Sequence, residues 1–182
     1  KVREGARRLA CPNRMRARGG DGRGRCTARH DAGCHVGRGL GLRAIAIIQD
    51  EHRTLAAVLH GLLFLVREIR DRGAAPDFAL LGSMLHYVDL FPERFHHPKE
   101  DRYLFALLRS RHPAAGPLID LLHNQHEIGA DRVRELEQRL ARYREGGVAE
   151  FPAFADAIEA YAVFHWDHMR REERDILPLA KE

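Results

Sequence analysis

Residues 164–178 read FHWDHMRREERDILP, and the expected fold of the chain is built around this stretch. His168 is followed four residues later by Glu172. On an α-helix two such residues lie on one face, about a turn apart, so that an imidazole nitrogen stands beside a carboxylate. This spacing is typical of metal ligands, and it is also ordinary for a surface ion pair. The stretch alone leaves both interpretations open.

The same pattern occurs again at residues 95–105, which read FHHPKEDRYLF. His96 precedes Glu100 by four residues, and an aromatic residue, an acidic neighbour and an apolar cluster flank the pair as they do near the C-terminus. Two helices that each offer a His and a Glu can close around a pair of ions. The repetition therefore favours a metal site over a surface ion pair.

Apolar residues recur at steps of three and four through four stretches of the chain, which predicts four amphipathic helices. The stretches begin near Ile45, near Asp77, after His112-Pro113 and near Glu150. Pro92 interrupts the second stretch, so we expect a kink or a break between Leu90 and Pro92. The fold class expected from this pattern is all-α, an up-down-up-down four-helix bundle.

Each expected helix carries a His at or near the middle of its apolar seam, and two helices add a Glu. Four core histidines satisfied separately are the alternative, but a shared level in a bundle favours one common site. An unpaired carboxylate there would cost several kcal/mol, so a buried Glu must be paired, hydrogen-bonded or bound to a cation. The predicted metal ligands are His52, His96, Glu100, His126, His168 and Glu172.

Four imidazoles and two carboxylates can supply two octahedral irons with terminal nitrogens and bridging oxygens, leaving positions open for a small molecule. A single zinc ion would need only four ligands. The donor set can therefore hold a pair of iron ions, which is the cofactor we expect. The sequence predicts no catalytic residue and no site for an organic cofactor.

The remaining histidines are expected to be less central. His60 and His86 lie too far along their helices to share the site. His97 and His123 flank ligands on the wrong face and are expected to support the ligands or to lie on the surface. His165, one turn before His168, is expected to support a ligand more readily than to bind metal.

Gly129 lies one turn after His126 in the third apolar seam, where glycine is a poor helix residue. Two interpretations stay open. The glycine leaves space beside the metal pair for a small ligand, or it permits a close contact between helices.

Residues 1–42 differ from the rest of the chain. Residues 1–43 hold twelve of the thirty Lys and Arg residues, three of the twenty-six acidic residues and nine of the sixteen glycines. We expect residues 1–42 to form a disordered basic leader and residues 43–182 to form the bundle. Whether residues 1–42 are native stays open. No aromatic residue is interleaved to stack on bases, which argues against nucleic-acid binding. Cys26, His30, Cys34 and His35 lack the spacing of a zinc finger.

The positions of the cysteines and the apolar residues indicate the cellular compartment. All three cysteines, Cys11, Cys26 and Cys34, fall in the leader, so disulfides cannot staple the expected bundle. No apolar run is long enough to span a bilayer. The expectation is a soluble cytoplasmic protein without a membrane partner, and its oligomeric state is not predicted.

The segments 50–52, 96–100, 125–127 and 168–173, with the Leu-Pro that follows, resemble the hemerythrin-like HHE cation-binding domain over about Ile45 to Ala180. The resemblance implies an up-down four-helix bundle around an oxo- or hydroxo-bridged di-iron centre. It further implies His52, His96, His126 and His168 as terminal ligands. Glu100 and Glu172 would be the bridging carboxylates.

The chain departs from the oxygen-carrying hemerythrins in two places. Its third expected helix lacks an HxxxH pair, since His123 and His126 are three apart, and Glu172 stands where the carriers have an Asp one residue later. We therefore expect binding or sensing of O2, NO or peroxide, or iron handling, over reversible oxygen carriage. Enzymatic turnover of peroxide stays open. The alternative is a metal-stabilised protein-interaction module without redox chemistry.

Overall fold

The computed structural model describes residues 32–182, with side chains from Leu42 onward. Within this range every regular element is helical. The α-helices are α1 Ala32–Arg72, α2 Phe78–Val88, α3 His97–Lys99, α4 Ala106–Arg111, α5 Gly116–Gly146 and α6 Phe151–Arg171. The π-helical segments are η1 Asp89–His96, η2 Glu100–Phe105 and η5 Glu172–Ile176, and the 3-10 segments are η3 Pro113–Ala115, η4 Gly147–Glu150 and η6 Leu179–Lys181.

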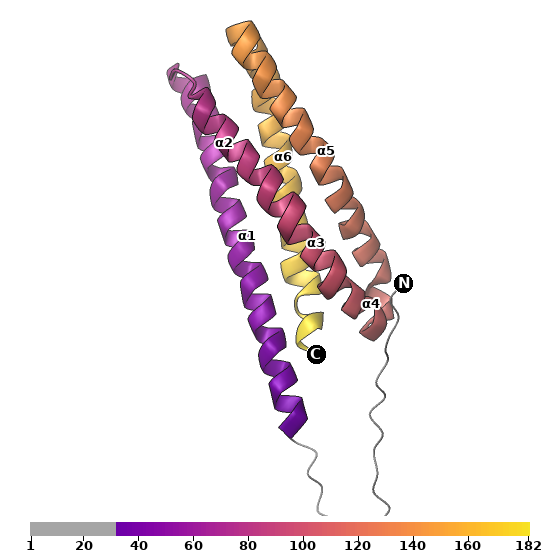
Figure 1. Ribbon diagram of the computed structural model, residues 1–182. Coiled ribbons are helices and arrows are strands. Elements are labelled where there is room, and N and C mark those ends of the chain that lie inside the picture. Colours follow the sequence, from indigo (N-terminus) through magenta and orange to yellow (C-terminus); the bar gives the residue numbers. More distant parts are fainter. Residues whose placement is uncertain (1–31) are drawn as a thin grey trace, which may run out of the picture.

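These elements make four helical stretches that pack side by side as a bundle (Figure 1). The first stretch is α1, the second runs from α2 to α4, the third is α5, and the fourth joins α6 to η5. Helix α1 packs against α2 and α6, and α5 packs against the same two helices. The four stretches therefore enclose one long interior that receives the apolar seam of each.

The first connection follows from local sequence. Helix α1 ends at Arg72, and Gly73 adopts a φ of 63°, a left-handed conformation that glycine tolerates best. Pro76 follows, and the side chain of Asp77 accepts a hydrogen bond from the backbone N–H of Leu80 at 2.9 Å. A glycine stop and an aspartate N-cap thus produce the sharp reversal into α2.

We expected either a kink or a break near Pro92, and the second stretch does not break there. It continues from α2 into the π-helix η1, which contains Pro92, and the N–H of His97 bonds to the carbonyl of Pro92, five residues back. Proline lacks an N–H and clashes with the preceding turn of an α-helix, and a wider π-helical turn absorbs that conflict without ending the helix. Helical structure therefore carries through to Arg111.

The apolar interior is divided into two clusters, and the predicted ligands lie between them. The larger cluster includes Leu62, Leu81, Val133, Phe154 and Ile158. The smaller cluster consists of Phe105, Leu108, Ile119, Leu122 and Ile176. A polar layer between two apolar layers is shielded from water along the bundle axis, which strengthens electrostatic interactions within it.

The expected leader falls mostly outside the described residues. Residues 1–31 are not described, and neither are the side chains up to residue 41, so the zinc arrangement weighed for Cys26 and its neighbours also lies outside them. Helix α1 begins at Ala32, within the stretch expected to be a leader. Among the described residues, none of the helices combines the length and apolarity needed to cross a membrane.

Candidate metal centre

The six predicted ligands come from all four helical stretches and lie together in the bundle interior. His52 projects from α1, His126 from α5 and His168 from α6, while three further members sit at or beside π-helical segments. Each of the six side chains is at most 6 % exposed. Their role as metal ligands stays a prediction, and their assembly at one level is a structural fact.

Each of the four imidazoles presents its Nε2 atom to one or both of the two carboxylates. Nε2 of His52 lies 3.2 Å from Oε2 of Glu172 and 3.7 Å from Oε1 of Glu100. Nε2 of His96 lies 3.4 Å from Oε2 of Glu100. Nε2 of His168 lies 3.4 Å from Oε2 of Glu172.

His126 approaches both carboxylates at once. Its Nε2 lies 3.6 Å from Glu100 and 3.7 Å from Glu172, and 3.1 Å from Nε2 of His168. Ligand atoms that share an ion at bond lengths of about 2.1 Å lie about 3.0 to 3.4 Å apart. The spacing of these nitrogens and oxygens is therefore compatible with shared cations.

Two groups of four side chains could each hold a metal ion, and both carboxylates belong to each group. One group is His52, His96, Glu100 and Glu172. The other is Glu100, His126, His168 and Glu172. Two adjacent cations with shared carboxylates fit this donor set.

Orphaned polar atoms test whether the residues fit a metal pair. Both carboxylate oxygens of Glu100 and of Glu172, and Nε2 of His52 and His96, are buried without a hydrogen-bond partner among the described residues. Leaving such groups unpaired costs about 1 to 3 kcal/mol each, and more when they are charged. Because the orphaned atoms all face the same small volume, cations placed there would satisfy them together.

The pKa values of the metal-free chain also indicate that positive charge is favoured between the two carboxylates. Burial alone would lower the pKa of His52, but Glu100 and Glu172 outweigh it and raise that pKa to about 10. Burial likewise opposes the charge on His126, whose pKa is raised to about 9 by Asp101 and the two glutamates. In the absence of metal, protons on these two imidazoles offset the carboxylates.

The other members of the set keep different protonation states. Burial lowers the pKa of His96 to about 4 and that of His168 to about 3, so both imidazoles are neutral at pH 7. Burial and the charge of Glu172 raise the pKa of Glu100 to about 8. Burial would raise the pKa of Glu172, but three surrounding imidazoles lower it well below its usual value. Neutral imidazoles and carboxylates are the forms that bind metal.

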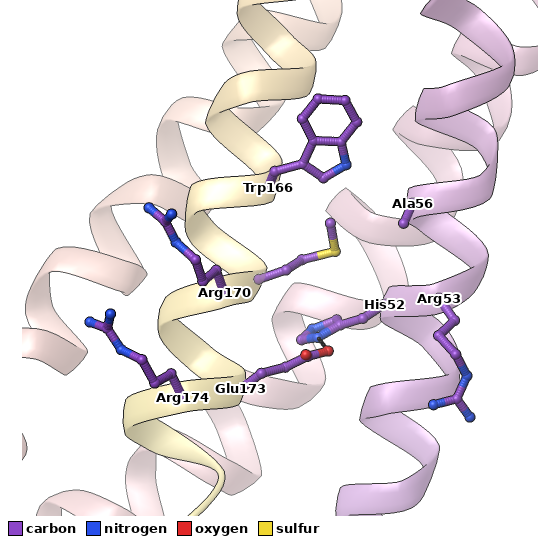
Figure 2. A pocket seen from close by; sticks show the side chains of 8 residues that line it. His52, Arg53, Ala56, Trp166, Arg170, Glu173 and Arg174 are labelled. Atoms are coloured by element: carbon purple, nitrogen blue, oxygen red, sulfur yellow. Dashed lines mark hydrogen bonds and ion pairs between the residues drawn. The ribbon is translucent and has the colours of Figure 1, made fainter.

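A ring of outer contacts orients the four imidazoles through their Nδ1 atoms. Nδ1 of His52 lies 3.0 Å from Oε1 of Glu173, and Figure 2 shows this contact bridging α1 and η5 beside a surface pocket. Nδ1 of His96 lies 2.7 Å from Oε2 of Glu51. A carboxylate on the far nitrogen fixes the orientation of a ligating histidine and raises its basicity.

The other two imidazoles complete the ring. Nδ1 of His126 lies 3.1 Å from Oδ1 of Asp101, and Nδ1 of His168 lies 3.1 Å from Oε1 of Gln125. Each stretch thus supplies a partner to a ligand on the next stretch, and the last stretch supplies Glu173 to the first. Only Gln125, among these four partners, is uncharged.

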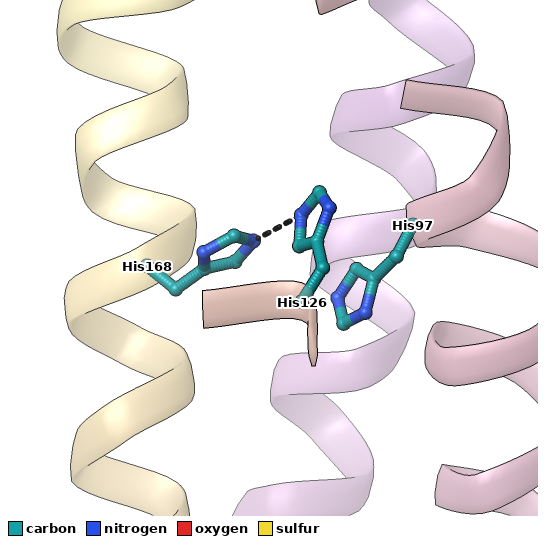
Figure 3. Close-up of side chains that lie close together, drawn as sticks. All are labelled: His97, His126 and His168. Carbon is teal, nitrogen blue, oxygen red and sulfur yellow. Dashed lines mark hydrogen bonds between the residues drawn. The ribbon is translucent and has the colours of Figure 1, made fainter. Parts of the chain in front are cut away.

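His97 is fully buried and corrects our assignment of it to the wrong face. Its ring stacks on that of His126 with centroids 4.1 Å apart. With His126 and His168 it forms a third group that could hold an ion, and Figure 3 shows these three side chains close together. The wide turns of η1, which ends at His96, turn two successive histidines inward. His97 is therefore an additional candidate ligand.

A buried carboxylate that the sequence analysis missed lies next to His97. Oε2 of Glu93 lies 3.2 Å from Nδ1 of His97, and the hydroxyl of Tyr161 donates to Oε1 of Glu93 at 3.4 Å. Burial would raise the pKa of Glu93, but His165 and His97 lower it to about 2. Glu93 therefore carries its charge inside the bundle.

Gly129 makes room for that carboxylate. A Cβ atom at this position would stand 2.8 Å from Oε1 and 2.9 Å from Oε2 of Glu93. The space that we considered for a small ligand is thus filled by a side chain of the neighbouring stretch. Close contact between helices, the second of our two interpretations, describes this site.

The other histidines lie largely where the sequence placed them. His165 is completely buried, with Nε2 3.6 Å from Glu93, and it belongs to none of the groups that could hold an ion. His60 lies against Trp166, with ring centroids 5.0 Å apart, and His86 is exposed. The side chain of His123 is half exposed and contacts Asp101.

The sequence did contain a signal for the outer partners. Each one is the immediate chain neighbour of a predicted ligand: Glu51, Asp101, Gln125 and Glu173. One residue along a helix is a rotation of about 100°. When a ligand points to the centre of a four-helix bundle, its chain neighbour therefore points at the adjacent helix. There it can contact the Nδ1 atom of the ligand on that helix.

Within residues 32–182, fold and site together define a class of protein, a helical bundle whose buried His and Glu residues form groups that could hold a metal ion. A family model described as the hemerythrin HHE cation-binding domain matches residues 43–180. The chain belongs to that family. Searches of curated proteins and of solved structures gave no match.

Proposed function

We propose that the chain is a non-haem di-iron protein that binds or senses a small molecule, O2, NO or peroxide, or that handles iron. The observation that carries this proposal is the convergence of four imidazole Nε2 atoms on two carboxylates that are shared by both candidate groups. A nitrogen-rich set with bridging carboxylates suits iron. Two irons held there would supply redox chemistry and could bind a small ligand.

The roles of the residues follow from their positions. His52 and His96 would hold one ion, His126 and His168 the other, and Glu100 and Glu172 would bridge them. With metal bound, the outer partners would hold each Nδ1 proton, so that each Nε2 lone pair faces inward. The two apolar clusters on either side exclude water from the bundle axis.

The alternation of the outer partners supports an up-down-up-down order of the four stretches. Glu51 precedes its neighbouring ligand, Asp101 follows one, Gln125 precedes one and Glu173 follows one. Viewed from one end of the bundle, the chain winds clockwise in one helix and anticlockwise in an antiparallel neighbour. If every outer partner contacts the next helix in the same direction around the bundle, the partners must therefore alternately precede and follow a ligand in the chain. The lack of cysteine in residues 43–182 supports a reducing compartment such as the cytoplasm.

The test is an optical spectrum of the iron-loaded chain recorded under air, under argon, and after addition of NO or peroxide. A binding or sensing protein gives a charge-transfer band that changes with the gas and returns when the gas is exchanged. Continuous consumption of peroxide instead identifies an enzyme. A spectrum that responds to none of these additions contradicts the proposed small-molecule role.

A further inference from the structure

A second cluster of metal-ligating side chains lies on the outer side of His126, at the surface of the bundle. Oδ1 of Asp101 is 3.0 Å from Nδ1 of His123 and 3.1 Å from Nδ1 of His126. These three side chains form a group that could hold an ion by itself. It differs from the inner groups because two of its members reach solvent.

Two shallow hollows give access to this cluster. One, of about 230 Å³, is lined by Asp101, Phe105 and His123 among others. The other, of about 180 Å³, is lined by Asp101 and His126 together with Glu93 and Glu127. No Lys or Arg occurs among the described residues that line this second hollow. Three carboxylates around a hollow attract cations to it.

The donor atoms are placed so that a proton or a metal ion can lie between them. His123 is half exposed, and its Nε2 lies 3.9 Å from Oε1 of Glu127. If Nε2 carries the proton towards Glu127, Nδ1 presents a lone pair to Asp101. His126 is 6 % exposed, and its Nδ1 is buried 3.1 Å from the same oxygen. Lone pairs about 3 Å apart repel unless a proton or a metal ion lies between them.

We propose that Asp101, His123 and His126 form an outer loading site that captures a divalent cation from solvent and passes it to the inner centre. This inference rests on the proposed di-metal centre. The ring of His126 links the two places, because its Nδ1 faces the outer cluster and its Nε2 faces Glu100 and Glu172.

The shared ring also limits occupancy. A neutral imidazole has one lone pair, so His126 serves one ion at a time. When its Nε2 binds an inner ion, its Nδ1 carries the proton and donates to Asp101. In the empty protein an outer ion takes the place of the proton on Nδ1, and the outer site weakens as the inner centre fills, which suits transit better than storage.

The experiment follows the uptake of Fe²⁺ alone into the full chain after removal of metal with a chelator. Stopped-flow absorbance of the loaded centre gives the rate, and metal analysis gives the final iron per chain. For the wild type the observed rate levels off as Fe²⁺ concentration rises, because ions first occupy a saturable outer site. His123→Ala slows loading by about tenfold or more at low Fe²⁺, with the same final iron per chain and a rate that stays linear in Fe²⁺.

His123→Arg separates a metal role from a charge role, since an arginine keeps the ion pair with Asp101 but offers no lone pair. The proposal requires His123→Arg to load as slowly as His123→Ala. His86→Ala, which removes an exposed histidine outside every cluster, should load at the wild-type rate. Half-exposure of His123 makes these changes tolerable for folding, which circular dichroism checks.

Three outcomes overturn the loading site: wild-type rates in His123→Ala, wild-type rates in His123→Arg, or a lower final iron content in either variant. The last would place His123 in the resident centre. Failure of the wild type itself to bind iron would instead refute the proposed function, so the two ideas fail in distinguishable ways.

Discussion

Oε1 of Glu173 lies 3.0 Å from Nδ1 of His52, so the chain neighbour of one predicted bridging carboxylate orients a predicted ligand on the opposite end of the sequence. The same relation repeats around the bundle until it returns to its start. A change in any one outer partner should therefore act on a ligand that is distant in sequence.

Glu173→Ala tests this relation at a partly exposed position, where the side chain is 44 % exposed. We expect the affinity for the ion held by His52 and His96 to fall by about 10- to 100-fold, because an unsupported imidazole is less basic and less well aimed. Glu173→Gln keeps a hydrogen-bond acceptor, so its affinity for the ion should lie between those of the wild type and of Glu173→Ala. Competition with a chelator measures the affinity. Glu135→Gln, at an exposed glutamate of α5, is the control and should bind as the wild type does.

The uncharged member of the ring offers a gain-of-charge test. Gln125→Glu would give His168 a carboxylate partner like the other three imidazoles. We expect tighter iron binding and a lower reduction potential of the centre, since added negative charge favours the oxidised metal. Gln125→Leu should shift both quantities the other way. An unchanged potential in both variants, measured by spectroelectrochemistry, would show that Gln125 does not support His168.

Loading should release protons. At pH 7 the metal-free chain holds protons on His52, His126 and Glu100, whose pKa values are about 10, about 9 and about 8. Binding removes these protons from the donor atoms, so about three leave per chain. Acid opposes this release, and we expect iron to be lost as pH falls below roughly 6. An indicator dye in weakly buffered solution counts the protons. Full iron retention at pH 4 would contradict the assignment.

Gly129 and Glu93 form a pair suited to a double-mutant cycle. Gly129→Ala places a methyl group against the Glu93 carboxylate, which is held by His97 and Tyr161, so we expect a loss of about 1 to 3 kcal/mol in the free energy of unfolding. In a Glu93→Ala background the clash is gone, and alanine should stabilise the helix by about 1 kcal/mol over glycine. Urea unfolding of the metal-free chains measures both. Equal effects in the two backgrounds would refute the contact.

The burial of several candidate ligands at one level of the bundle could be predicted, because helices are regular. Spacings of three and four placed His52, His126 and His168 in apolar seams, and the structure buries all three. The inward turn of His97 could not be predicted, since it depends on a π-helical segment around Pro92. Glu93 was missed for a related reason. Its burial is stabilised by partners from α6 and by a glycine of α5, which no local pattern reveals.

Iron content measured on the wild type and on His126→Ala tests the central claim most directly. The account predicts two irons per chain in the wild type and the loss of one or both in the variant, because His126 contacts both shared carboxylates. A wild-type chain purified without chelators and supplied with Fe²⁺ that holds no iron, or a His126→Ala variant that holds two as tightly as the wild type, would contradict it.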